Sequence, residues 1–193
     1  MMDMHLPIFV RSDLEDVLSP DVGPLHVWVA DGSILPTVRS RGTGSPHLFS
    51  GLGLFQGAAI GALVAQGVSI SEAACVVYVE ISNERWSELF LVFDKDASHE
   101  AWVLVARRKG EPDQVESYFA KESDPLNLGG LCRLMARGGG KGVQMDDGAA
   151  PSDDDSGERE DWYRVTPYPI GSDLGRAMLR LRGMYERKTA LRR

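Results

Sequence analysis

Residues 25–36 have the sequence LHVWVADGSILP, which combines a short apolar helix pattern with a strong stop signal. Leu25 and Trp28 are one helical turn apart, so both side chains are expected on the side of the helix that faces a core. Gly32 can end this helix, because glycine adopts the left-handed backbone conformation that follows many helices. Residues 36–49 then predict a small β-hairpin.

A first helix is predicted immediately upstream, over residues 8–18. Ser12 is expected to be its N-cap, and Glu15 occupies the capping-box position. The motif Ser19-Pro20-Asp21 predicts a turn, and the second helix is expected to begin near Pro24, which is tolerated in a first turn. The predicted order is helix, turn, helix and hairpin.

This order resembles the winged helix-turn-helix domain of the mercury-resistance-regulator (MerR) family. Leu25, Trp28, Gly32 and Leu48-Phe49 occupy the family's aliphatic, aromatic, glycine and wing-closing positions, and residues 68–73 are similar to the segment after the wing. The resemblance covers residues 5–82. It implies a DNA-binding transcriptional regulator, a homodimer that binds a two-fold site on double-stranded DNA through the helix of residues 22–31.

The candidate DNA-binding residues are His26, Arg39, Arg41 and His47. His26 and His47 stand where the family usually has arginine, and histidine carries little charge at neutral pH. Arg39 and Arg41 would therefore supply much of the attraction to phosphate. The alternative is a protein-interaction module that kept the winged-helix shape and lost DNA binding, which the acidic first helix and the formal net charge of −7 favour.

Composition narrows the class of protein further. The chain has 193 residues, 43% of them hydrophobic, which is sufficient for a core. Its two cysteines, Cys75 and Cys132, lie far apart, which predicts buried thiols in a reducing cytoplasm and no disulfide framework. No signal-peptide pattern opens the chain. Residues 51–68 are apolar, but Gln56 and Gln66 interrupt them and favour a core helix over a membrane span.

Downstream of the hairpin, the pattern predicts a helix over residues 52–65 that ends at Gly67, and a second one, capped by Ser69 or Ser71, that continues to Val77. Residues 89–93 and 101–106 are rich in β-forming side chains and are separated by a polar stretch. They predict a β-hairpin. Its aromatic side chains are expected to stabilise the hairpin by packing and not to form a ligand pocket.

Residues 138–161 are rich in glycine and aspartate, which predicts an acidic, disordered linker. Beyond it, Ser172 is expected to cap a helix with an apolar stripe of Leu174, Ala177, Met178, Leu181, Met184 and Tyr185. Three roles remain open for this helix. It could mediate dimerisation, pack on its own domain, or use its basic face to bind the linker or nucleic acid.

The sequence therefore predicts a mainly α fold with small β elements (α+β). The expected divisions are a winged helix-turn-helix domain at 5–82, a small α/β region at 83–137, the linker at 138–161 and the C-terminal helix at 162–193. The four histidines lie outside any nucleophile or metal-ligand motif, so no enzyme activity, metal or cofactor is expected. No membrane contact is expected, and the sequence does not identify a small-molecule effector.

Overall fold

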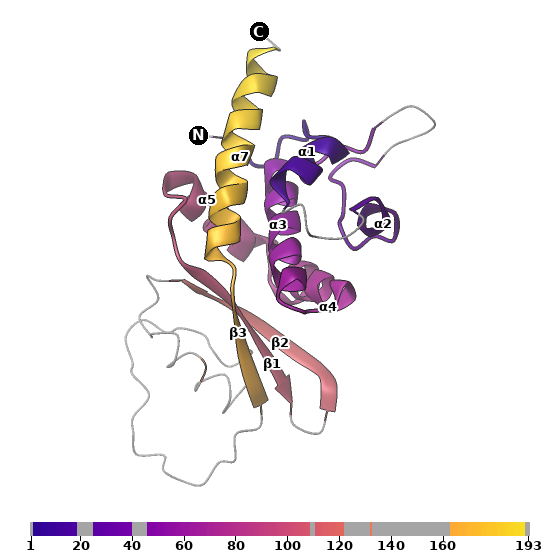
Figure 1. Cartoon of the computed structure of the whole chain (residues 1–193), viewed down its shortest axis with the longest axis vertical. Helices are drawn as coiled ribbons and strands as arrows, with labels where there is room; N and C mark the ends of the chain where they lie inside the picture. The colour runs from indigo at the N-terminus through magenta and orange to yellow at the C-terminus, as the bar shows by residue number, and fades with distance from the viewer. Residues whose placement is uncertain are drawn as a thin grey trace. The chain divides into compact units, whose positions relative to one another are not determined.

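The structure is a computed structural model that describes residues 2–18, 25–39, 46–108, 111–121, 132 and 163–191. The chain divides into a helical unit, residues 1–100 with 170–193, and a sheet unit, residues 101–169. Helices predominate and the β-structure is small, which confirms a mainly α fold with small β elements (Figure 1). The predicted linker at 138–161 lies outside the described residues.

The helical unit contains six α-helices and one π-helical segment in its described part. They are α1 (Arg11–Val17), α2 (Leu25–Ala30), α3 (Gly51–Ala65), α4 (Ile70–Cys75), η1 (Val76–Glu80), α5 (Asn83–Lys95) and α7 (Gly171–Ala190).

Helix α3 forms the centre of this unit. Every residue from Gly51 to Leu63 is buried, and α1, α4, α5 and α7 all pack against the helix. The Ser50 hydroxyl caps its first turn by accepting a hydrogen bond from the Gly53 amide at 3.1 Å, and the positive φ of Gly67 allows the chain to turn after it. A helix that is apolar on all sides suits such a core position. No helix in the described part of the chain is both long and apolar enough to cross a bilayer.

Helix α5 replaces one strand of the predicted β-hairpin. Trp86, Leu89, Phe90 and Phe93 are buried at spacings of three and four residues, so they form one stripe of a helix. Ser82 caps the helix by accepting a hydrogen bond from the Arg85 amide at 3.3 Å. The prediction of a strand at residues 89–93 is therefore wrong: the side chains are of β-forming types, but the spacing of the buried ones is that of a helix.

The sheet unit contains three described strands, β1 (Ala101–Arg108), β2 (Glu111–Lys121) and β3 (Tyr163–Pro169). Their order is β2-β1-β3, and both pairings are antiparallel. The predicted strand at residues 101–106 is confirmed as part of β1. Its hairpin partner is β2, which follows it in sequence, and β3 pairs with its other edge.

The start of α1 differs from the expected capping pattern. The helix begins at Arg11, and Asp13 accepts a hydrogen bond from the Val10 amide at 2.6 Å. Ser12 and Glu15 are both exposed and do not cap the helix. Asp13 is 9% exposed and forms an ion pair with Lys188 of α7 at 2.9 Å. The residue that caps the start of α1 is therefore positioned by a contact that is distant in sequence.

Helix α7 belongs to the same compact unit as residues 1–100. It begins at Gly171, and Ser172 is not its N-cap. The side chains of Leu174, Ala177, Met178 and Leu181 are fully buried, and the helix packs on α3, α1 and α5. The apolar stripe therefore packs on its own domain and is not available for self-association. The C-terminal helix is therefore part of the helical unit, whereas the sequence predicted a separate division at 162–193.

The thiol of Cys75 is exposed and that of Cys132 is partly exposed. The prediction of two buried thiols is therefore wrong. Cys75 is the last residue of α4.

Candidate nucleic-acid interface

Helix α2 presents two different faces. Trp28 is 6% exposed, whereas His26 and Val27 are exposed. The carbonyl of Trp28 accepts a hydrogen bond from the Ile34 amide at 2.8 Å, and the Ile34 side chain is fully buried. The prediction that Trp28 belongs to the core is confirmed. The side of α2 away from Trp28 therefore carries exposed side chains.

A tight turn follows α2. Gly32 has a φ of 84°, in the left-handed region that glycine favours, which confirms the predicted stop. The carboxylate of Asp31 accepts a hydrogen bond from the Ser33 amide at 2.8 Å. That bond stabilises the charged form and lowers the pKa of Asp31 below its usual value.

The predicted hairpin is present at its base. Val38 and Leu48 form an antiparallel bridge with backbone hydrogen bonds of 2.9 and 3.0 Å. Ser50 donates its amide proton to the Thr37 hydroxyl at 2.9 Å, which joins the two arms where they meet α3. The tip, residues 40–45, lies outside the described residues, and Arg41 lies there with it.

The bridge places two of the four predicted site residues on the same hairpin. Val38 and Leu48 form this bridge, and Arg39 and His47 are the residues directly beyond it on the two arms. Both side chains are exposed. His26 comes from a different element, the outer face of α2, and is also exposed.

The charge on this surface is close to balanced. In the described residues 25–39 and 46–50, the acidic and basic side chains are Asp31 and Arg39, and His26 and His47 are exposed beside them. Val27, Leu35 and Val38 are each 40–43% exposed on the same segment. Electrostatic attraction to phosphate in the described part of this surface therefore depends mainly on Arg39.

Tyr78 forms a hydrogen bond with the segment between α2 and the hairpin, a contact that no sequence pattern predicts. Its hydroxyl accepts a hydrogen bond from the Leu35 amide at 3.2 Å and so connects η1 to the turn before the hairpin. Burial raises the pKa of Tyr78 to about 12. No local motif indicates this contact, because the two residues are far apart in sequence.

Tyr78 gives a testable dependence of stability on pH. The folded state keeps the hydroxyl proton up to about pH 12, whereas the unfolded chain loses it near the ordinary tyrosine pKa of 10. Stability is therefore expected to fall as pH rises between these values, by about 2–3 kcal/mol in total. Urea denaturation across this range should give a shallower fall for Tyr78→Phe than for the wild type. Tyr185→Phe, in the same unit, is the matched control, and equal slopes for all three proteins would contradict the assignment.

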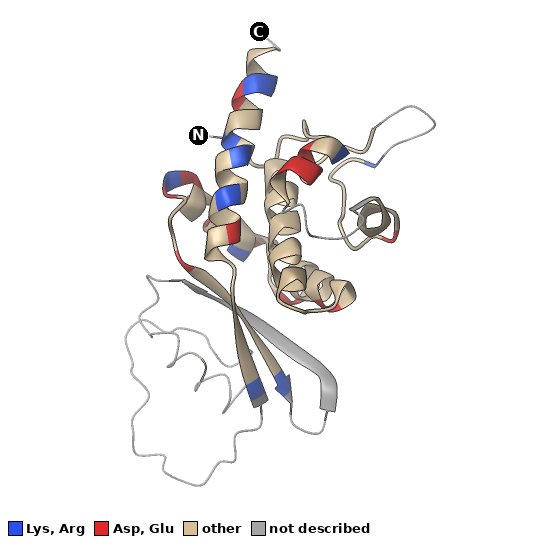
Figure 2. Cartoon of the chain, viewed as in Figure 1, with Lys and Arg blue, Asp and Glu red and all other residues tan. Residues whose placement is uncertain are grey.

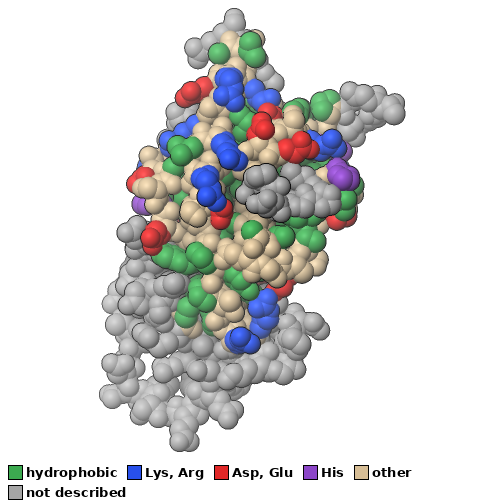
Figure 3. Space-filling view, viewed as in Figure 1, with side chains coloured by type: hydrophobic (Ala, Val, Ile, Leu, Met, Phe, Trp, Pro, Cys, Tyr) green, Lys and Arg blue, Asp and Glu red, His purple; other side chains and the backbone are tan. Residues whose placement is uncertain are grey.

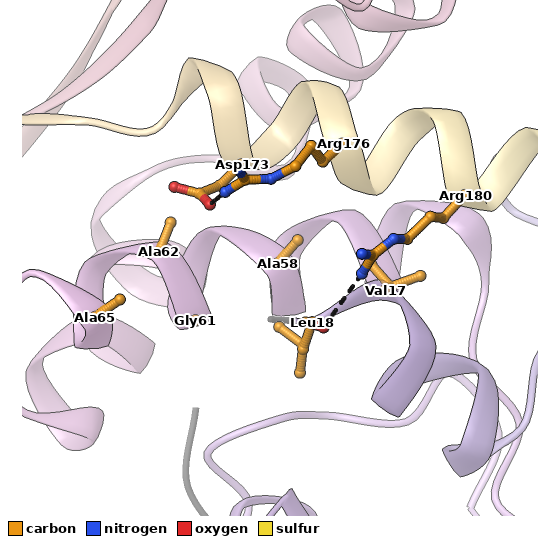
Figure 4. A pocket seen from close by; sticks show the side chains of 9 residues that line it. All are labelled: Val17, Leu18, Ala58, Gly61, Ala62, Ala65, Asp173, Arg176 and Arg180. Carbon is orange, nitrogen blue, oxygen red and sulfur yellow. Dashed lines mark hydrogen bonds and ion pairs between the residues drawn. The ribbon is translucent and has the colours of Figure 1, made fainter. Parts of the chain in front are cut away.

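A separate hollow of about 220 Å³ lies between α3, α7 and the end of α1 (Figure 4). Small residues of α3, among them Ala58, Gly61 and Ala62, leave the space, and charged side chains of α7 border it. Arg180 donates to the backbone carbonyl oxygens of Asp16 and Leu18 at 2.7 and 3.4 Å. Arg176 forms an ion pair with Asp173.

The arginine side chains around the hollow are therefore bonded to other groups of the same chain, and these bonds give no evidence of a ligand. Across the described residues, no group of three or more His, Cys, Asp or Glu side chains could hold a metal ion. The surface of α2 and the hairpin is therefore the candidate site that the geometry best defines. No protein-family model and no curated protein matches this sequence.

Proposed function

We propose that the chain is a DNA-binding transcriptional regulator of the MerR-like type that acts as a homodimer on a two-fold site. One observation carries the proposal: α1, α2, a glycine turn and a hairpin base follow in the order of a winged helix-turn-helix, with Trp28 inward and His26 outward. In such a domain the second helix enters the major groove. The hairpin residues Arg39 and His47 would then contact the flanking phosphates.

The proposal predicts a specific effect of Arg39. Arg39→Ala should weaken binding to every duplex and reduce the slope of log affinity against log salt by about one, because one phosphate contact is removed. Fluorescence anisotropy with a non-specific duplex and with fragments of the upstream region would measure both quantities. Lys95→Ala is the matched control: it removes one exposed positive charge from the end of α5 and should leave the slope unchanged.

The second candidate function is a protein-interaction module. It is favoured by the exposed apolar side chains Val27, Leu35 and Val38 on a surface with almost no net charge. The same titration separates the two candidates. If the folded protein binds no duplex even at low salt, where attraction to phosphate is strongest, the interaction module becomes the better proposal.

A further inference from the structure

A groove of about 540 Å³ runs between α1 and α7 on the surface of the helical unit. Its floor includes Leu18 and Met184, which are 3% and 4% exposed. Leu179 stands at its edge and is 59% exposed, although the other leucines of α7 are fully buried. Figure 3 shows the green of apolar side chains between blue and red ones on this face.

The two walls of the α1–α7 groove carry opposite charges. Glu15 and Asp16 project from α1 and Arg187 projects from α7, whereas Arg180 crosses the groove and donates to the backbone carbonyl oxygens of Asp16 and Leu18. Figure 2 shows red on α1, with blue at one end of the helix, and several blue positions along α7 with red among them. Of the described side chains that line the groove, none forms an ion pair across it. Glu15 instead contacts Arg11 along its own helix at 3.5 Å.

We propose that the α1–α7 groove is the contact surface between two copies of this chain, related by a two-fold axis that runs along the groove. Such an axis lays α7 of each copy over α1 of the other. Each copy's Arg187 then faces Glu15 and Asp16 of the second copy, while Arg180 keeps its bonds to α1 of its own chain. A two-fold interface requires a surface that complements itself, and one acidic wall beside one basic wall meets that requirement.

Apolar contacts agree with the same geometry. In this arrangement, Leu179 of each copy enters the groove of the other copy and contacts Leu18 and Met184. The exposed Leu179 side chain is thereby removed from water. Gly183 lies on the approaching side of α7, and a Cβ atom there would meet only the flexible Arg187 side chain, at 3.5 Å. The backbone of α7 can therefore approach the second copy closely.

This inference rests on the homodimer of the proposed function and specifies its interface. It differs from the stripe that the sequence suggested, because that stripe is buried inside the unit. Self-association is measured without DNA and DNA binding is measured separately. A failure of one is therefore distinguishable from a failure of the other.

The first test is sedimentation velocity of the full chain over a wide range of concentration. We expect a dimer for the wild type and a monomer for Leu179→Glu. Leu191→Glu is the matched control, because Leu191 is 88% exposed just beyond α7 and does not line the groove; it should remain a dimer. Circular dichroism confirms that each variant is folded. A monomeric wild type, or a dimeric Leu179→Glu variant, overturns the proposal.

A charge exchange tests the relative placement of the two copies. The double variant Glu15→Lys, Asp16→Lys should lose dimerisation, and so should Arg187→Glu, because each brings like charges together. Combining all three substitutions should restore the dimer. Glu84→Lys, Glu88→Lys on α5 makes the same change in net charge away from the groove and should have no effect. A combined variant that stays monomeric overturns the proposed arrangement.

Discussion

Deletion of residues 171–193 is expected to unfold the helical unit. The deletion removes Leu174, Met178, Leu181 and Met184, all at most 4% exposed, and uncovers the faces of α3 and α5 on which they pack. Burial of each such side chain contributes about 1.5–3 kcal/mol. The sum is comparable with the whole stability of an ordinary domain, about 5–15 kcal/mol.

Two ion pairs that α7 makes with the rest of the unit add to this effect. Without the helix, Lys188 no longer neutralises Asp13, and Arg182 no longer bonds to Asp94, at 3.1 Å in the intact chain. Far-UV circular dichroism and thermal melting would measure the outcome. Removal of residues 191–193 alone is the control and should leave the melt unchanged, since Leu191 is exposed and lies beyond the last turn of α7. A shortened chain that melts cooperatively near the wild-type temperature would contradict the packing assigned to α7.

Trp86→Ala is expected to cost about 3–5 kcal/mol in the free energy of unfolding, as for other large core truncations. Trp86 is fully buried and meets Phe55 edge-on, with ring centroids 6.3 Å apart. Its indole nitrogen donates a hydrogen bond to the Val77 carbonyl at 2.7 Å, which joins α5 to η1. The substitution therefore leaves a cavity and an unsatisfied carbonyl together.

Two further variants separate these effects. Trp86→Phe retains most of the ring volume but leaves the Val77 carbonyl without this donor, so a loss of about 1–3 kcal/mol is expected. Val79→Ala, at a side chain that is 71% exposed in η1, is the surface control and should change stability by less than about 0.5 kcal/mol. Urea denaturation followed by circular dichroism measures all three. A Trp86→Ala variant as stable as the surface control would show that this site is not close-packed.

Short sequence patterns correctly predicted those features of the fold that depend on residues close together in the chain. Gly32 and Gly67 end helices because both need a positive φ, and Ser69 caps α4 by accepting a hydrogen bond from the Glu72 amide at 3.3 Å. Trp28 faces inward, as its spacing predicts. In the candidate site, the hairpin base was predicted, and with it the placement of Arg39 and His47 on one element.

Predictions failed where distant contacts decide the outcome. Asp13 closes the start of α1 with the help of Lys188, and Tyr78 supports the turn at Leu35, yet neither pair shares a local motif. Residues 89–93 illustrate a different failure, because their side chains suit a strand while their spacing suits a helix. Burial against Phe55, whose ring lies 5.4 Å from that of Phe90, favours the helix.

The sequence by itself determined which faces must be buried and where helices must stop. These features depend on side-chain period and backbone freedom over a few residues. Only the tertiary structure decided what covers each face: α7 packs on α3 within its own unit, and β1 pairs with β3 from much later in the chain. The physical reason is that the hydrophobic effect has no direction, so an apolar stripe requires burial without specifying the surface that provides it.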